Sequence, residues 1–175
     1  MKLSLLGGFG PLFAFLAALS VSPVDAANTV YKTQEQFLSE SFSSVPAPKT
    51  LWLKGELKQN IKDLIGQNYG KLRVRYWQQG QRTAWVLEAI GKEQPITFGY
   101  LVEQGKIIDA EVLIFRESRG WEVHRPAFTK QFIGAELEQQ RLSQTIDGIS
   151  GATLSVRAMD KTARLALYLA EHLGS

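Results

Sequence analysis

The residue types best suited to chemistry lie close together near the C-terminus, in the run Asp147-Gly148-Ile149-Ser150-Gly151-Ala152-Thr153-Leu154-Ser155. The hydroxyls of Ser150 and Thr153 are separated only by Gly and Ala, whose small side chains let another molecule approach the backbone closely. A helical pattern follows. The first N–H groups of a helix lack intrahelical acceptors, so together with the helix dipole they favour an anion. A hydroxyl, a bare backbone and a positive helix end suit a phosphate group.

The same residues also fit the ordinary start of a helix. Ser and Thr are common N-caps, and Gly-Ala before a helix is unremarkable in itself. A Thr hydroxyl is not nucleophilic at neutral pH without a base or a metal, and the run contains no histidine. Thr153 is therefore interpreted either as part of a cap or as an acceptor that another enzyme modifies, and no catalytic residue is predicted.

The pattern Asp-x-x-Ser-Gly-Ala-Thr-x-Ser resembles the flavinylation motif of the FMN-binding domain family. That family includes subunits of the sodium-pumping NADH:quinone oxidoreductase and of Rnf-type electron-transfer complexes. The resemblance extends from about Gly70 to the end of the chain. It implies that Thr153 carries FMN through a phosphoester bond, installed by a separate flavin transferase that uses FAD and releases AMP. The frame that this transferase would recognise is Asp147, Ser150, Gly151, Ala152 and Ser155.

A second segment that looks like this family is Glu117-Ser118-Arg119-Gly120, which follows a predicted strand. On its residues alone it is a solvated, charged loop. The resemblance implies that the loop lies against the bound flavin, with Glu117, Ser118 and Gly120 as cofactor contacts. The chain departs from the family at Trp121-Glu122-Val123, where members in respiratory complexes often have Gly-Leu-Gly. Trp121 could stack on the isoalloxazine ring or be a core or rim tryptophan.

Composition limits the other possibilities. The chain has 175 residues, of which 45% are hydrophobic, enough for one domain with a genuine core. It has no cysteine, so disulfides, thiolate metal sites and thiol nucleophiles are excluded, and its two histidines are too far apart in sequence to favour a metal site. The net charge is +3, with basic residues interleaved with acids, so nucleic-acid binding is not expected.

The N-terminus is expected to direct export. Residues 1–26 have a positive start, an uncharged and mostly apolar run from Leu5 to Leu19, and small residues in Val24-Asp25-Ala26 before a cleavage site. The alternative is a retained membrane anchor, because the uncharged stretch from Leu3 to Val24 is long enough to span. In both cases residues 27–175 are predicted to form the FMN-binding domain, outside the cytoplasm.

Four strands with a period of two are predicted to form the sheet that positions these groups. Their ranges are Lys71–Trp77, Arg82–Ile90, Ile96–Glu103 and Lys106–Phe115. In the first strand Leu72, Val74 and Tyr76 are expected on the buried side, and Trp77 is expected on the solvated side. Short polar connections predict an antiparallel meander. The family resemblance similarly implies a strongly curved antiparallel sheet, or half-barrel, backed by helices.

Three helices are predicted to pack against this sheet. A capping box opens the first, from Thr33 to Phe42, and the second spans Glu56 to Ile65. The long C-terminal helix, Leu154 to Leu173, has a stripe of small residues that lets it lie close to the strands. This helix is expected to fix Thr153 relative to the loop at Glu117. The predicted fold class is α+β.

The resulting hypothesis is an exported, periplasmic flavoprotein with FMN bound covalently at Thr153. It relays electrons between a membrane or periplasmic donor and an acceptor, so a flavin transferase and a membrane redox partner are the expected partners. Two alternatives remain open. One is a flavin-dependent reductase that acts directly on a small acceptor, and the other is a flavin-free binding or assembly module.

Overall fold

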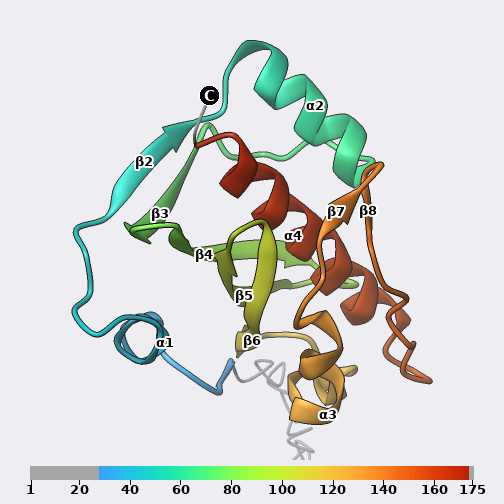
Figure 1. Cartoon of the computed structure of the whole chain (residues 1–175). Helices are drawn as coiled ribbons and strands as arrows, with labels where there is room; N and C mark the ends of the chain where they lie inside the picture. The colour runs from blue at the N-terminus through green and yellow to red at the C-terminus, as the bar shows by residue number, and fades with distance from the viewer. Residues whose placement is uncertain (1–27, 174–175) are drawn as a thin grey trace, which may run out of the picture.

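A six-stranded antiparallel sheet organises the computed structural model, which describes residues 28–173 (Figure 1). The strands lie in the order β1-β6-β5-β4-β3-β2, so β2 to β6 form a meander and β1 is added beside β6. Their bounds are β1 Thr29–Val30, β2 Lys49–Trp52, β3 Arg73–Gln79, β4 Arg82–Ile90, β5 Pro95–Glu103 and β6 Lys106–Phe115. The sheet does not close, and the predicted α+β fold class with an antiparallel meander is confirmed. The predicted signal segment lies outside the described residues.

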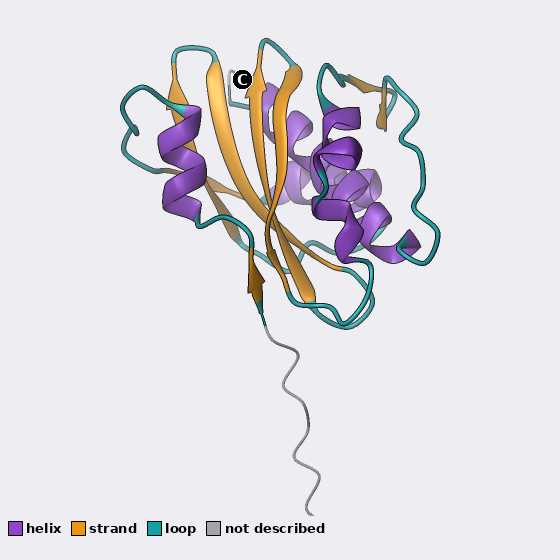
Figure 2. Ribbon diagram, turned by 90° about the horizontal axis from the view of Figure 1, so that it is seen from below, coloured by secondary structure: helices purple, strands orange, loops and turns teal. Residues whose placement is uncertain are grey.

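Helices cover both faces of the sheet (Figure 2). On one face lies α1, and on the other α4 packs on the middle strands with α2 against it. Their bounds are α1 Gln34–Ser41, α2 Gly55–Ile65 and α4 Thr153–Glu171. The connection from β6 to α4 holds short elements: η1 Trp121–His124, α3 Pro126–Thr129, η2 Lys130–Phe132 and the hairpin of β7 Leu137–Glu138 with β8 Arg141–Leu142. Among residues 28–173, no helix combines the length and the apolar character that crossing a bilayer requires.

Each face of the sheet has its own hydrophobic core. The larger core lies between the sheet, α2 and α4, and the smaller lies under α1. Trp77 belongs to the smaller core and is only 5% exposed, so its predicted solvated position is wrong. Leu72, predicted to be buried, is 65% exposed because β3 begins at Arg73, two residues after the predicted start at Lys71. The Trp77 error arises because α1 covers a face of the sheet that the strand pattern alone marks as wet.

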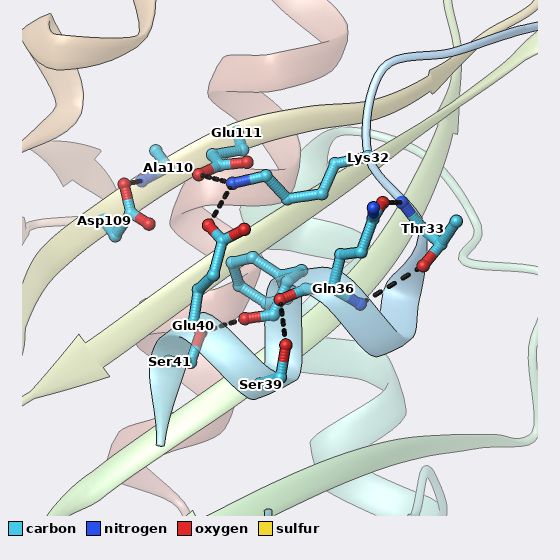
Figure 3. Close-up of polar contacts among 10 residues, drawn as sticks. Lys32, Thr33, Gln36, Ser39, Glu40, Ser41, Asp109, Ala110 and Glu111 are labelled. Atoms are coloured by element: carbon cyan, nitrogen blue, oxygen red, sulfur yellow. Dashed lines mark hydrogen bonds and ion pairs between the residues drawn. The ribbon is translucent and has the colours of Figure 1, made fainter. Parts of the chain in front are cut away.

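A lysine at the end of β1 ties α1 to the sheet (Figure 3). The Lys32 ammonium donates to the carboxylates of Glu40 on α1 and Glu111 on β6, each at 2.6 Å. Burial lowers the pKa of Lys32, but the hydrogen bonds to these two carboxylates outweigh it and the pKa is raised. The predicted capping box of α1 is present, formed by Thr33 and Gln36. The chain before α1 is therefore fixed beside β6.

One buried tyrosine joins α4 to the middle of the sheet. The Tyr100 hydroxyl on β5 donates to the Met159 carbonyl at 2.9 Å and lies 2.7 Å from the Thr162 hydroxyl, both on α4. The alanines on the same side of α4 are buried, as expected for a helix that lies close to the strands. These contacts fix α4 against β5, and with it the position of the residues at its N-terminus.

Candidate functional site

The residue at the N-terminus of α4 is Thr153, and its side chain is exposed. Ala152 occupies the N-cap position and has no side chain that could accept a hydrogen bond, so the expected capping role of Ser150 or Thr153 is not realised. Exposure differs sharply within the motif. Ala152 and Ser155 are 3% and 4% exposed, whereas Asp147, Ser150 and Thr153 are open to solvent.

The first turn of α4 has the properties that a phosphate group requires. The first backbone N–H groups of the helix have no intrahelical acceptor, and no side chain caps them. A helix of 19 residues adds the positive end of its dipole at the same place. The backbone before it is open, because a Cβ added at Gly148 or Gly151 would meet nothing within 4 Å. An exposed hydroxyl beside uncapped amides fits an esterified phosphate.

The loop after β6 meets this turn at Gly120. Its φ of +86° is a left-handed conformation that favours glycine, and the residue is buried. A Cβ at this position would lie 2.6 Å from the Ser155 hydroxyl and 3.4 Å from the Ala152 Cα. The structure thus brings together Gly120, Ala152 and Ser155, three of the residues predicted to form the site.

Glu117 faces a different neighbour. Its Oε1 accepts hydrogen bonds from the backbone N–H groups of Lys92, Glu93 and Gln94, the last two at 2.7 and 2.9 Å. These residues form the turn between β4 and β5. The carboxylate is therefore engaged with the backbone of the sheet, while the neighbouring Ser118 is exposed to solvent.

The segment that leads into the motif is held by a residue outside the predicted site. The Gln131 side-chain oxygen accepts from the backbone N–H of Asp147 at 2.7 Å. The Gln144 amide donates to the Gln131 carbonyl, so one glutamine fixes the approach to the motif from two sides. The Asp147 carboxylate itself is on an exposed residue. No local sequence pattern identifies a partner that is 16 residues away.

Trp121 follows Gly120 directly and lies at the rim of the protein. It is 42% exposed, and the Arg125 guanidinium lies 4.8 Å from the centre of its ring. The ring centroid of His124 is 5.5 Å from that of Trp121, and His124 in turn stacks on Tyr31 at 4.0 Å. The core position is therefore wrong, and stacking of Trp121 on the flavin ring stays a prediction.

A cavity of about 480 Å³ opens beside the first turns of α4. Its walls combine apolar and charged side chains, namely Arg141, Leu142, Gln144, Thr145, Ile146, Val156, Arg157, Asp160 and Arg164. Asp160 pairs with Arg164 at 3.0 Å, whereas Arg157 and Arg141 have no ion-pair partner within residues 28–173. The apolar side chains and arginines of this cavity would suit part of an organic anion attached at the N-terminus of α4.

Comparison with known proteins gives a match to the family described as FMN-binding domain, over residues 91–168. This confirms the resemblance over a shorter range than the sequence suggested. The matched range begins at the turn that binds Glu117, includes the loop to Gly120 and extends through most of α4. No curated protein and no solved structure gives a significant match.

Proposed function

We propose, on the premise that residues 91–168 belong to the FMN-binding domain family, that this flavoprotein carries its FMN covalently on Thr153 and relays electrons outside the cytoplasm. The observation that carries the proposal is the exposed Thr153 hydroxyl at the first position of α4, beside backbone amides that no side chain caps. Those amides and the helix dipole would hold the charge of a phosphodiester.

The neighbouring hydroxyls are less suited to the attachment. Ser155 is 4% exposed and packs against Gly120, so a transferring enzyme could not reach it without opening the loop. Ser150 is exposed but precedes the helix, away from the first-turn amides. Thr153 alone among the motif hydroxyls combines exposure with a position in the first turn.

The phosphoester would be formed by a separate flavin transferase, because no base is hydrogen-bonded to the Thr153 hydroxyl in the part of the chain that the structure describes. The Thr153 oxygen would form a bond to the FMN phosphorus of FAD as the pyrophosphate bond breaks and AMP leaves, with the hydroxyl proton passing to a base of the transferase. The exposed Asp147, Ser150 and Gly151 are available for its recognition. Ala152 and Ser155 would instead shape the motif from inside the fold.

Once bound, FMN supplies one- or two-electron transfer, and the protein supplies position and electrostatics. Covalent attachment is an advantage where lost FMN cannot be replaced from the cytoplasm, which agrees with the expected export signal in residues 1–26. We infer a periplasmic carrier that receives electrons from, or delivers them to, a membrane partner.

The attachment is tested by co-expressing the chain with a flavin transferase in the periplasm. We expect flavin fluorescence on a denaturing gel and an intact mass increased by one FMN less water. Thr153→Ala should abolish both signals, whereas Ser150→Ala, which alters the recognition frame and keeps the acceptor hydroxyl, should slow loading but still yield covalent flavin. Covalent flavin on Thr153→Ala would overturn the site, and wild-type protein at its bare polypeptide mass would overturn the attachment.

The relay is tested separately from the attachment, with the loaded protein and an artificial electron donor. We expect the flavin to be reduced once and then to be reoxidised only by a protein partner. Steady turnover of a small acceptor by the isolated protein would favour the reductase instead.

A further inference from the structure

We propose that Glu117 is a positioning residue, which fastens the loop after β6 to the β4–β5 turn and so holds the first turn of α4 in place. This one side chain accepts hydrogen bonds from three consecutive backbone N–H groups of the turn. The N–H groups of Lys92, Glu93 and Gln94 all point to a single carboxylate oxygen, Oε1. Successive backbone N–H groups in a turn form a concave site for an anion, and hydrogen bonds to a carboxylate are stronger than neutral ones.

The turn is shaped to receive this carboxylate. Gly91 begins it, and its N–H donates to the Gln94 carbonyl at 3.1 Å. A Cβ at Gly91 would lie 2.8 Å from Glu117 Oε1, so a larger residue would push the carboxylate away. The glycine and the three converging amides together make a fitted site for the Glu117 side chain.

The other end of the same loop is fixed on α4. Gly120, three residues after Glu117, packs against Ser155 and Ala152 with no room for a Cβ. The loop is therefore held at both ends, by a carboxylate on the sheet and by bare backbone on the helix. Displacement of Glu117 would free the end of the loop that keeps Gly120 against the motif.

This role differs from the one that the family resemblance implied, in which Glu117 lies against the flavin. The two roles depend differently on the negative charge of Glu117. The turn amides need an acceptor oxygen at Oε1, which the side-chain carbonyl of a glutamine also offers, with weaker hydrogen bonds than a carboxylate makes. A carboxylate beside a flavin would instead act through its negative charge. Glu117→Gln therefore separates the two roles, and Glu117→Ala removes both.

The anchor itself is tested on the unloaded protein by amide hydrogen exchange, with Ser118→Ala as a neighbouring exposed control. We expect the amides of residues 92–94 to exchange roughly tenfold faster or more in Glu117→Ala, faster by a smaller factor in Glu117→Gln, and within about threefold of wild type in Ser118→Ala. Unchanged exchange in Glu117→Ala would overturn the proposal. This measurement needs no flavin, so it stands or falls independently of the proposed function.

The consequence for the motif rests on the proposed function and is measured as flavin transfer. For Glu117→Ala we expect the transferase KM to rise several-fold. Glu117→Gln should give a smaller rise, with its bound flavin unchanged in absorption maximum and reduction potential. A shifted potential in Glu117→Gln, with normal exchange at residues 92–94, would assign the carboxylate to the flavin instead. Equal transfer to Glu117→Ala and wild type would also contradict the positioning role.

Discussion

At the scale of single residues, the site depends on how closely two backbones approach. Gly120 and Gly134 have nearly the same left-handed φ, +86° and +85°. An added Cβ at Gly120 meets Ser155, whereas one at Gly134 meets nothing within 4 Å. This pair of glycines separates the cost of backbone strain from the cost of a lost fit between loop and helix.

We expect Gly134→Ala to lower the free energy of unfolding by about 1 kcal/mol, from backbone strain alone. Gly120→Ala should lower it by roughly 1 to 3 kcal/mol more, because the new methyl group overpacks the contact with Ser155. Urea denaturation of both variants gives the comparison. Equal losses would mean that the loop can move away from α4 without penalty.

Two glutamates on the sheet should give stability opposite dependences on pH. Burial alone would raise the pKa of Glu88, but the Lys71 ammonium at 2.7 Å, with Thr97 and Arg116, outweighs burial and lowers it. Burial raises the pKa of Glu111, and the hydrogen bond from Lys32 offsets this only in part.

Because its folded pKa is lowered, Glu88 contributes stability above its unfolded pKa, and that contribution is lost as pH falls through the folded value. The stability contribution of Glu111 has the opposite pH dependence. It is largest below the unfolded pKa and is lost as pH rises through the raised folded pKa. Glu88→Gln should therefore flatten the loss of stability in acid, and Glu111→Gln should not. Chemical denaturation between about pH 3 and pH 7 tests this, and the same slope in both variants would contradict it.

At the scale of elements, the position of α4 relative to β5 decides where Thr153 lies. The Tyr100 hydroxyl bonds two groups of the helix and is fully buried. Tyr168 lies on α4 itself, and its buried hydroxyl has no hydrogen-bond partner within the part of the chain that the structure describes. The two tyrosines differ in what their oxygens contribute, not in the size of their rings.

Tyr100→Phe is expected to lower the free energy of unfolding by roughly 1 to 2 kcal/mol, because it removes hydrogen bonds that join helix and sheet. The matched control Tyr168→Phe removes an unsatisfied hydroxyl, so it should be neutral or slightly stabilising. Thermal and urea unfolding measure both. If both variants lose the same stability, the Tyr100 contacts do not hold α4.

At the scale of the whole molecule, the two faces of one sheet form two separate hydrophobic cores with different roles. The core under α4 positions the motif, and the core under α1 closes the opposite face. Phe37 belongs to the second core, is 1% exposed and packs on Gly99, where a Cβ would lie 3.0 Å from its ring. Substitutions in this core should affect the motif only by lowering the stability of the whole fold.

Phe37→Ala is expected to lower the free energy of unfolding by about 3 to 5 kcal/mol, since it leaves a large cavity. The fraction that stays folded should still accept flavin at the wild-type rate. Trp52→Ala is the control, because that side chain is 52% exposed and should change stability little. A lower transfer rate for folded Phe37→Ala would show that the two faces are coupled.

The strands and helices that the sequence predicted correctly are those with a clear period and a clear turn. The hairpin turns at Gly80 and Gly105, and the capping box at Thr33, are local signals, so β3 to β6 and α1 appear where expected. β2 was missed because its four residues have little alternation, and it is defined by its pairing with β3.

The candidate site divides in the same way. The motif around Thr153 is contiguous in sequence and could be identified from residue types. The partners of Glu117 could not, because the turn that binds it is more than 20 residues away and contributes only backbone N–H groups. The hold of Gln131 on Asp147 likewise depends on tertiary structure. The residue types of the motif could be identified from the sequence, but the hydrogen bonds made by distant backbone N–H groups could not.

The place of α4 in the chain has a consequence for biogenesis. Thr153 begins the last described helix, and that helix rests on strands synthesised well before it. The proposed acceptor surface therefore forms only when α4 has packed on those earlier strands. A transferase that binds this surface would modify only molecules in which α4 is packed on the sheet, so the flavin content of a preparation would report its folded fraction.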